Sequence, residues 1–215
     1  MARSKQPEAT IGKILEVSKR LFLKKGFDET TIQDIVDNLD RLTRGAIYHH
    51  FKSKEEILKA MSDRMALENI PLEAIKGRND LNGLQKIQEV LVLFQANEEL
   101  ESTISQTIPL YKNPRVMAAI LEARQRILTP LWRELIEDAK SDGSIQTDYE
   151  VELSNLLPTL NIMLGQTMET VNPCVLRNKF FFTIEMLSKM GLPVLNNNLK
   201  LLVEQLLADI PNKDE

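Results

Sequence analysis

The chain has 215 residues, with 27 lysines and arginines against 31 aspartates and glutamates, and a formal net charge of −4. Its single cysteine, Cys174, cannot form an internal disulfide, which indicates a reducing compartment. The N-terminal residues have no apolar core of signal-peptide length, and no apolar run approaches the roughly 20 residues of a membrane helix. We therefore expect a cytoplasmic protein that has no membrane partner.

The charge is unevenly distributed along the chain. Residues 1–60 contain 12 Lys/Arg and 9 Asp/Glu, a balance of +3, whereas residues 61–215 contain 15 and 22, a balance of −7. A locally basic region can bind a polyanion even when the whole chain is acidic, because binding responds to the local field. Chance variation of surface charge explains so small an excess equally well.

Helix signals follow one another along the whole chain and strand patterns are nearly absent, so we predict an all-α fold of nine or ten helices. The first helix is predicted from Thr10 onward, because apolar residues recur there at spacings of three and four. Gly26, which follows two lysines, is typical of a left-handed helix end. Phe27 comes next, where a hydrophobic contact often closes such an end.

Three helix starts then follow within 25 residues. Thr30 and Gln33 match the T-x-x-Q pattern of a capping box and predict the start of a second helix. Thr43 is expected to be the N-cap of a third helix. Ser53 and Glu56 form another predicted capping box, which opens a fourth helix.

The third helix has two contrasting faces. Ile47 and Phe51 lie one turn apart and are expected to face the core, while Arg44 and Tyr48 lie on the opposite side. An apolar rear with a front of small residues, a cation and hydrogen-bonding aromatic residues suits the DNA major groove. An ordinary surface helix would explain any one of these residues, but three capped helices in register are hard to obtain by chance.

Four motifs of this region match a known family. They are Gly26 and Phe27 at a helix end, residues 30–35 (TTIQDI), residues 44–51 (RGAIYHHF) and residues 52–56 (KSKEE). Together they cover about residues 10–60 and resemble the N-terminal domain of the TetR family of bacterial transcriptional regulators. The resemblance implies a helix-turn-helix DNA-binding domain, followed by a larger helical domain that binds a ligand and dimerises.

The resemblance also implies which residues contact DNA. Base and backbone contacts are expected from the front of the third helix, and phosphate contacts from its end, from the next helix start and from the start of the second helix. By position in this sequence, the first group is Thr43, Arg44, Gly45, Ala46, Tyr48 and His49, the second is His50 and Lys54, and the third is Thr30 or Thr31.

The turn between the second and third helices departs from the family pattern. Residues 38–43 are one residue longer than expected and lack the usual small residue, often glycine. Asp40 tolerates the left-handed conformation and is expected to replace that glycine. The set of DNA contacts depends on the geometry of this turn.

The C-terminal part is expected to form a separate domain. The helical pattern breaks between Pro71 and Gly83, so we expect a DNA-binding domain of residues 1–60 and a regulatory and dimerisation domain of residues 61–215. Asn113 followed by proline predicts the start of a long helix with a kink at Pro130.

Two later segments are more apolar than the outer helices of a monomer should be, namely residues 149–169 and 174–190. The resemblance implies that they pair with the same helices of a second subunit in a four-helix bundle, which makes the protein a homodimer. The alternative is that they form the inner core of one subunit.

The central helices are expected to enclose a pocket for a small amphipathic effector, since aromatic residues, methionines and an isolated cation suit such a ligand. Plain core packing is the alternative for each residue. The candidate lining residues are Phe94, Tyr111, Met117, Leu121, Arg124, Trp132 and Met163.

Enzyme chemistry has little support in the sequence. Cys174 and the pair His49 and His50 fall in different expected domains, and neither a Gly-rich phosphate loop nor an H-E-x-x-H motif is present. We expect no catalytic residues, no metal and no cofactor. The expected function is that of a ligand-responsive repressor that binds a palindromic DNA operator as a homodimer. The alternative is a helical protein-interaction module that has lost specific DNA binding.

Overall fold

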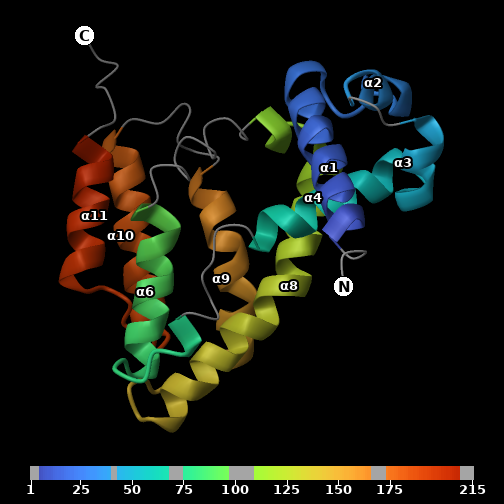
Figure 1. Ribbon diagram of the computed structural model, residues 1–215. Helices are drawn as coiled ribbons and strands as arrows, with labels where there is room; N and C mark the ends of the chain where they lie inside the picture. The colour runs from blue at the N-terminus through green and yellow to red at the C-terminus, as the bar shows by residue number, and fades with distance from the viewer. Residues whose placement is uncertain (1–4, 40–42, 68–74, 97–108, 166–172, 209–215) are drawn as a thin grey trace. The chain divides into compact units, whose positions relative to one another are not determined.

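The computed structural model describes residues 5–39, 43–67, 75–96, 109–165 and 173–208. Within these ranges the regular structure is helical and contains no β-strand, which confirms the all-α prediction (Figure 1). None of the described helices combines the length and the apolar composition of a membrane span. The helices are α1 (Lys5–Lys25), α2 (Ile32–Asp37), α3 (Arg44–His50), α4 (Lys54–Leu67), α6 (Gly83–Ala96), α8 (Pro114–Ser141), α9 (Glu150–Gly165), α10 (Pro173–Lys189) and α11 (Asn197–Ala208).

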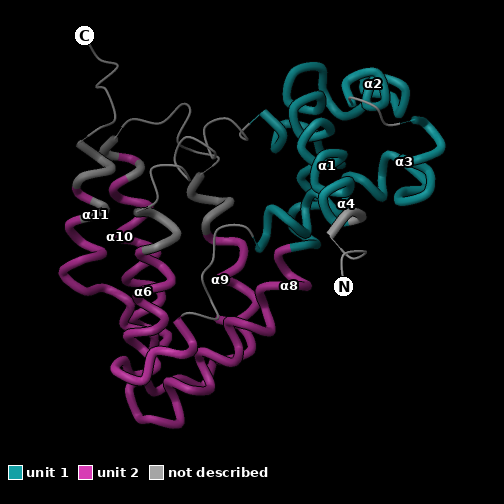
Figure 2. The backbone as a smooth tube through the Cα atoms, viewed as in Figure 1, with its two compact units in different colours: residues 1–68, 105–123 teal, residues 69–104, 124–215 magenta. Residues whose placement is uncertain are grey.

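The chain divides into two compact units (Figure 2). Unit 1 contains residues 1–68 and 105–123, and unit 2 contains residues 69–104 and 124–215. The sequence predicts domains of residues 1–60 and 61–215. The two units differ from these ranges, because residues 105–123 are part of unit 1. The division between 123 and 124 falls inside α8.

Unit 1 is built on the first four helices. α1 packs against α2 and α4, and α2 packs against α3. Apolar side chains from every one of these helices fill its interior, and a ring contact between Phe22 and Phe27, with centroids 5.1 Å apart, closes the end of α1. The fully buried residues include Ile14, Phe22, Phe27, Ile35, Ile47 and Ile57.

The prediction for the end of α1 is confirmed, and the prediction for the start of α2 is wrong. Gly26 has φ of 87°, the left-handed conformation expected after α1. The capping box of α2 is formed by Thr31 and Asp34, not by Thr30 and Gln33. The reason is that the Thr30 hydroxyl donates to the Gly26 carbonyl over 2.6 Å, and this contact moves the helix start by one residue.

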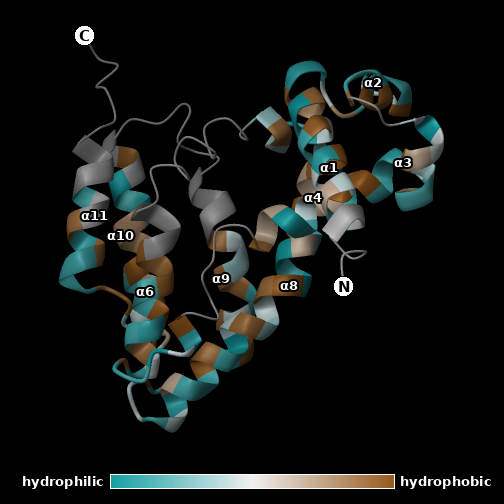
Figure 3. Cartoon of the chain, in the orientation of Figure 1, coloured by the Kyte–Doolittle hydropathy of each residue, from teal (hydrophilic) through white to brown (hydrophobic). Residues whose placement is uncertain are grey.

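Unit 2 has its own core, formed by α6, the later part of α8, and α9 to α11. Figure 3 shows apolar and polar stretches alternating along α8, as expected for a helix with one buried face. The predicted start of α8 is confirmed, because the Asn113 side-chain oxygen accepts from the amides of Arg115 and Val116. Pro130 lies inside α8, and the helix continues past it to Ser141.

Candidate nucleic-acid interface

α3 is held from behind and capped at its start. The Thr43 hydroxyl accepts from the Ala46 amide over 3.2 Å, which confirms Thr43 as the N-cap. Ile47 is 0% exposed and Phe51 is 7% exposed, so both predicted anchors are buried in unit 1. The rear of α3 is therefore fixed, while Arg44, Gly45, Tyr48 and His49 are exposed.

The outward face carries the cation and the aromatic residues predicted to contact DNA. Arg44 and His49 are exposed, and Tyr48 is 44% exposed despite its large ring. The Arg44 guanidinium lies 5.6 Å from the centroid of the Tyr48 ring and donates to the Tyr48 hydroxyl over 3.5 Å. The rings of His49 and His50 meet edge to face, with centroids 5.2 Å apart. Arg44 with Tyr48 and His49 with His50 thus form two pairs of hydrogen-bond donors on α3.

Gly45 leaves open space on this face. A Cβ atom added at Gly45 would meet only the Thr43 hydroxyl oxygen, at 3.8 Å, which is an ordinary van der Waals contact. The residue is exposed, and its backbone does not adopt the left-handed conformation that requires glycine. Nothing inside unit 1 therefore demands glycine at this position.

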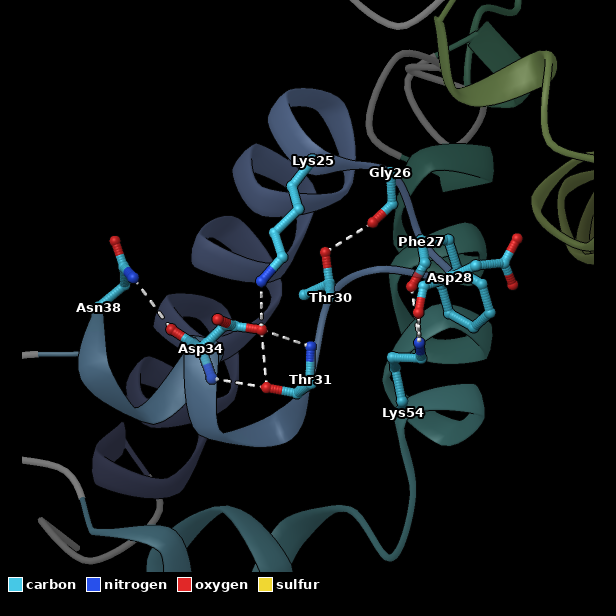
Figure 4. Close-up of polar contacts among 9 residues, drawn as sticks. All are labelled: Lys25, Gly26, Phe27, Asp28, Thr30, Thr31, Asp34, Asn38 and Lys54. Atoms are coloured by element: carbon cyan, nitrogen blue, oxygen red, sulfur yellow. Dashed lines mark hydrogen bonds and ion pairs between the residues drawn. The ribbon is translucent and has the colours of Figure 1, made fainter.

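The start of α2 presents Thr31 to solvent, while Thr30 is 1% exposed. Of the two threonines expected to contact phosphate, only Thr31 has an accessible side chain. The Asp34 carboxylate accepts from the amide and hydroxyl of Thr31, both over 2.7 Å, and pairs with the Lys25 ammonium at 2.7 Å (Figure 4). The Lys25 ammonium and then the Thr31 donors hold the pKa of the Asp34 carboxyl well below its usual range.

Lys54 has contacts that the sequence did not predict. Its ammonium donates to the carbonyls of Phe27 over 2.6 Å and Asp28 over 3.1 Å, and lies 4.4 Å from the centroid of the Phe27 ring (Figure 4). An ammonium has three N–H donors, so these carbonyls occupy two of them. Lys54 thus fastens the first turn of α4 to the connection between α1 and α2, and its phosphate contact stays a prediction.

The turn around Asp40 lies outside the described residues, so the effect of its extra length stays a prediction. The side chains of Phe94, Met163 and Cys174 also lie outside the described ones. Among the residues that the structure describes, no group of three or more His, Cys, Asp or Glu side chains could hold a metal ion.

The predicted pocket residues are divided between the two units. Tyr111, Met117 and Leu121 belong to unit 1, where each is half-buried. Arg124 and Trp132 belong to unit 2: Arg124 donates to the Pro158 carbonyl over 3.3 Å, and Trp132 lies in the core. Their role in binding an effector stays a prediction.

Large apolar side chains are exposed on the helices predicted to dimerise. Phe182 is 69% exposed and Val175 is 46% exposed, both on α10, and Val151 is 43% exposed on α9. Isolated exposed apolar residues are common on protein surfaces, but a phenylalanine this exposed is unusual.

Comparison with known proteins connects this geometry to a family. The sequence model described as "Bacterial regulatory proteins, tetR family" matches residues 14–61, which contain α2, α3 and the start of α4. The transcriptional repressor KstR2 of Mycolicibacterium smegmatis is 25% identical over 157 residues, or 69% of this chain and 73% of that protein. Residues 14–61 therefore match the N-terminal region of the bacterial tetR family of regulatory proteins. The KstR2 relative is named an HTH-type transcriptional repressor.

Two other regulators are similar to the chain, one in part of the sequence and one in fold. The regulator TtgR of Pseudomonas putida is 42% identical over 67 residues, or 30% of this chain and 31% of that protein. A transcriptional regulator from Saccharomonospora viridis, solved in complex with choline, superposes with a TM-score of 0.57 at 18% identity, covering 84% of this chain and 96% of that one. This structural likeness supports the fold.

Proposed function

We propose that the chain is a ligand-responsive repressor that binds a palindromic operator as a homodimer. The observation that carries the proposal is the two-sided construction of α3, with Ile47 and Phe51 buried behind it and Arg44, Gly45 and Tyr48 exposed in front. A helix fixed in this way and rich in donors on its open face can enter the major groove and contact base edges.

Each exposed residue of α3 has a distinct role in this proposal. Arg44 donates to a guanine edge or a phosphate, and the absence of a side chain at Gly45 lets the helix start approach the bases closely. Thr43 and Ala46 line the same helix start. Tyr48, His49 and His50 donate to phosphates, as Thr31 does from the start of α2.

The dimer places two copies of α3 in successive major grooves. The exposed apolar side chains of α9 and α10, Phe182 above all, support pairing with a second copy. A twofold-symmetric dimer of helix-turn-helix units requires two half-sites roughly 34 Å apart, and hence a palindromic operator.

A small amphipathic effector completes the proposal. The name of the KstR2 relative identifies that protein as a repressor, and the choline complex shows a ligand bound to a protein of the same fold. An effector that binds one dimer state better than the other by a few kcal/mol is sufficient to release the operator. The relatives are regulators, so we propose no enzymatic activity for this chain.

The test is binding to the DNA upstream of the chain's own gene, measured by fluorescence anisotropy at several salt concentrations. We expect a specific complex whose affinity falls steeply with salt, because lysines and arginines displace counterions from phosphates. The double variant Arg44→Ala/Tyr48→Ala should lose the specific complex. The control Arg133→Ala removes an exposed arginine from unit 2, outside the segments expected to dimerise, and should bind like the wild type.

Two outcomes would contradict the proposal. One is the absence of any specific complex, and the other is a complex that the Arg44 and Tyr48 substitutions leave unchanged. If the affinity for DNA does not depend on salt and the chain binds a protein partner tightly, a helical protein-interaction module that has lost specific DNA binding would be favoured instead.

A further inference from the structure

Asp28 ties the connection between α1 and α2 to two other helices of unit 1. It lies in the connection between α1 and α2, where its carbonyl and that of Phe27 accept from the Lys54 ammonium at the start of α4. Its carboxylate accepts from the Asn113 side-chain amide over 2.7 Å and pairs with Arg115 at 3.1 Å. The backbone of this connection is thus tied to α4, and its carboxylate is tied to the first turn of α8.

The donors on α8 are fixed by the helix itself. The Asn113 side-chain oxygen accepts from the amides of Arg115 and Val116, so its amide nitrogen is directed at Asp28 by the same contacts that cap the helix. A displacement of the first turn of α8 therefore acts directly on the Asp28 carboxylate.

α8 is the helix within which the division between the two units falls. Its residues up to 123 belong to unit 1, and its residues from 124 belong to unit 2. The later part supplies Leu128, Leu135 and Ile136 to the core of unit 2. A change in the packing of that core thus acts on the same helix that binds Asp28.

We propose that Asp28 is a positioning residue for DNA recognition, which couples the first turn of α8 to the helix-turn-helix through the α1–α2 connection. This inference rests on the proposed function, since it concerns how α3 is held when it binds DNA. The connection sets the start of α2 through Thr31 and holds α4, which follows directly after α3. Loss of the contact with α8 lets the α1–α2 connection move more freely. More conformational entropy is then lost when α3 docks on DNA.

A double-mutant cycle in DNA binding tests the coupling. The variants are Asp28→Ala, Arg115→Ala and both together, in the full-length protein, with the upstream duplex that the wild type binds. Each single variant also changes the charge near the DNA, and the cycle removes that additive effect. Asp28 and Arg115 are 52% and 73% exposed, and such ion pairs contribute about 0.2–1 kcal/mol, so the expected non-additivity in Kd is about 1.4- to fivefold.

A matched pair separates coupling from simple stabilisation. Arg78 and Asp80 form an exposed ion pair at 2.5 Å within unit 2, outside the segments expected to dimerise. The cycle Arg78→Ala and Asp80→Ala should show coupling in thermal unfolding but additive effects on DNA binding. The charge-reversed protein Asp28→Arg/Arg115→Asp should bind DNA within twofold of the wild type. If either alanine variant fails to fold, Asp28→Asn and Arg115→Gln replace them in the cycle.

The result that would overturn the inference is additivity of the Asp28 and Arg115 substitutions in DNA binding, with the wild type still forming its specific complex. Equal coupling for the Arg78 and Asp80 pair would overturn it as well. Absence of a specific wild-type complex would contradict the proposed function itself and this inference with it, so the two failures are distinguishable.

Discussion

A single methyl group added at Gly45 should change protein stability and DNA binding in opposite directions. Glycine in a helix costs about 0.5–1 kcal/mol relative to alanine, because it loses more backbone freedom on folding. The added Cβ atom would meet only the Thr43 oxygen at 3.8 Å, so the folded protein accommodates it without strain. Gly45→Ala should therefore raise the free energy of unfolding by about 0.5–1 kcal/mol.

The same methyl group should weaken DNA binding. It would occupy the space at the start of α3 through which, in our proposal, the helix approaches the bases. Forcing a methyl group into a closely packed interface costs about 1–3 kcal/mol, so we expect Kd for the operator to rise by roughly fivefold to a hundredfold. The assays are urea unfolding and fluorescence anisotropy on the same preparation.

Gly12→Ala is the matched control. Gly12 also lies inside a helix, α1, and a Cβ atom there would meet only the end of the flexible Arg64 side chain, at 3.4 Å. This variant should gain comparable stability without weakening DNA binding. A Gly45→Ala protein that binds the operator as tightly as the wild type would refute the close approach of α3 to DNA.

Three further substitutions test the structure of the two units. Lys54→Met keeps the aliphatic chain but removes two charge-assisted hydrogen bonds, and should lower the free energy of unfolding by about 1.5 kcal/mol in urea titrations; an unchanged value would contradict the role of its ammonium. Gly83→Ala should destabilise by about 3 kcal/mol in the same assay, because the new Cβ atom collides with the backbone of Ala139, and a stabilised variant would rule out this close packing of α6 on α8. The pKa of Asp34 is lowered by Lys25 in the folded state, so its contribution is fully present above the ordinary value of 3.8 and is lost as the pH falls below it. The stability difference between wild type and Asp34→Asn should thus be constant above about pH 5 and shrink under acid, and a pH-independent difference would contradict the ion pair.

Local signals predicted the fold where the decisive contacts are close in sequence. Gly26 ends α1, Thr43 caps α3 and Asn113 caps α8, as expected from capping patterns alone. The start of α2 was misplaced by one residue, because two adjacent threonines offer two registers for the cap. The hydrogen bond from Thr30 to the Gly26 carbonyl decides between them.

Contacts between distant residues could not be predicted in the same way. Lys54 lies 27 positions from Phe27, and Arg115 lies 87 positions from Asp28. Periodicity identifies a buried face but not the partner of an exposed side chain, so neither the carbonyl contacts of Lys54 nor the contacts of Asp28 could be predicted from the sequence. Likewise, the position of residues 105–123 in the chain does not indicate that they pack with residues 1–68 in unit 1.

The central claim is that the exposed face of α3 reads base pairs, and an operator scan with the Arg44→Ala variant tests it most directly. Every base pair of the operator is substituted in turn, and the loss of affinity is compared between wild type and variant. We predict that the variant loses discrimination, worth about 1–3 kcal/mol, at one base pair in each half-site and keeps it elsewhere. A variant that binds more weakly but retains the full wild-type profile would contradict the claim.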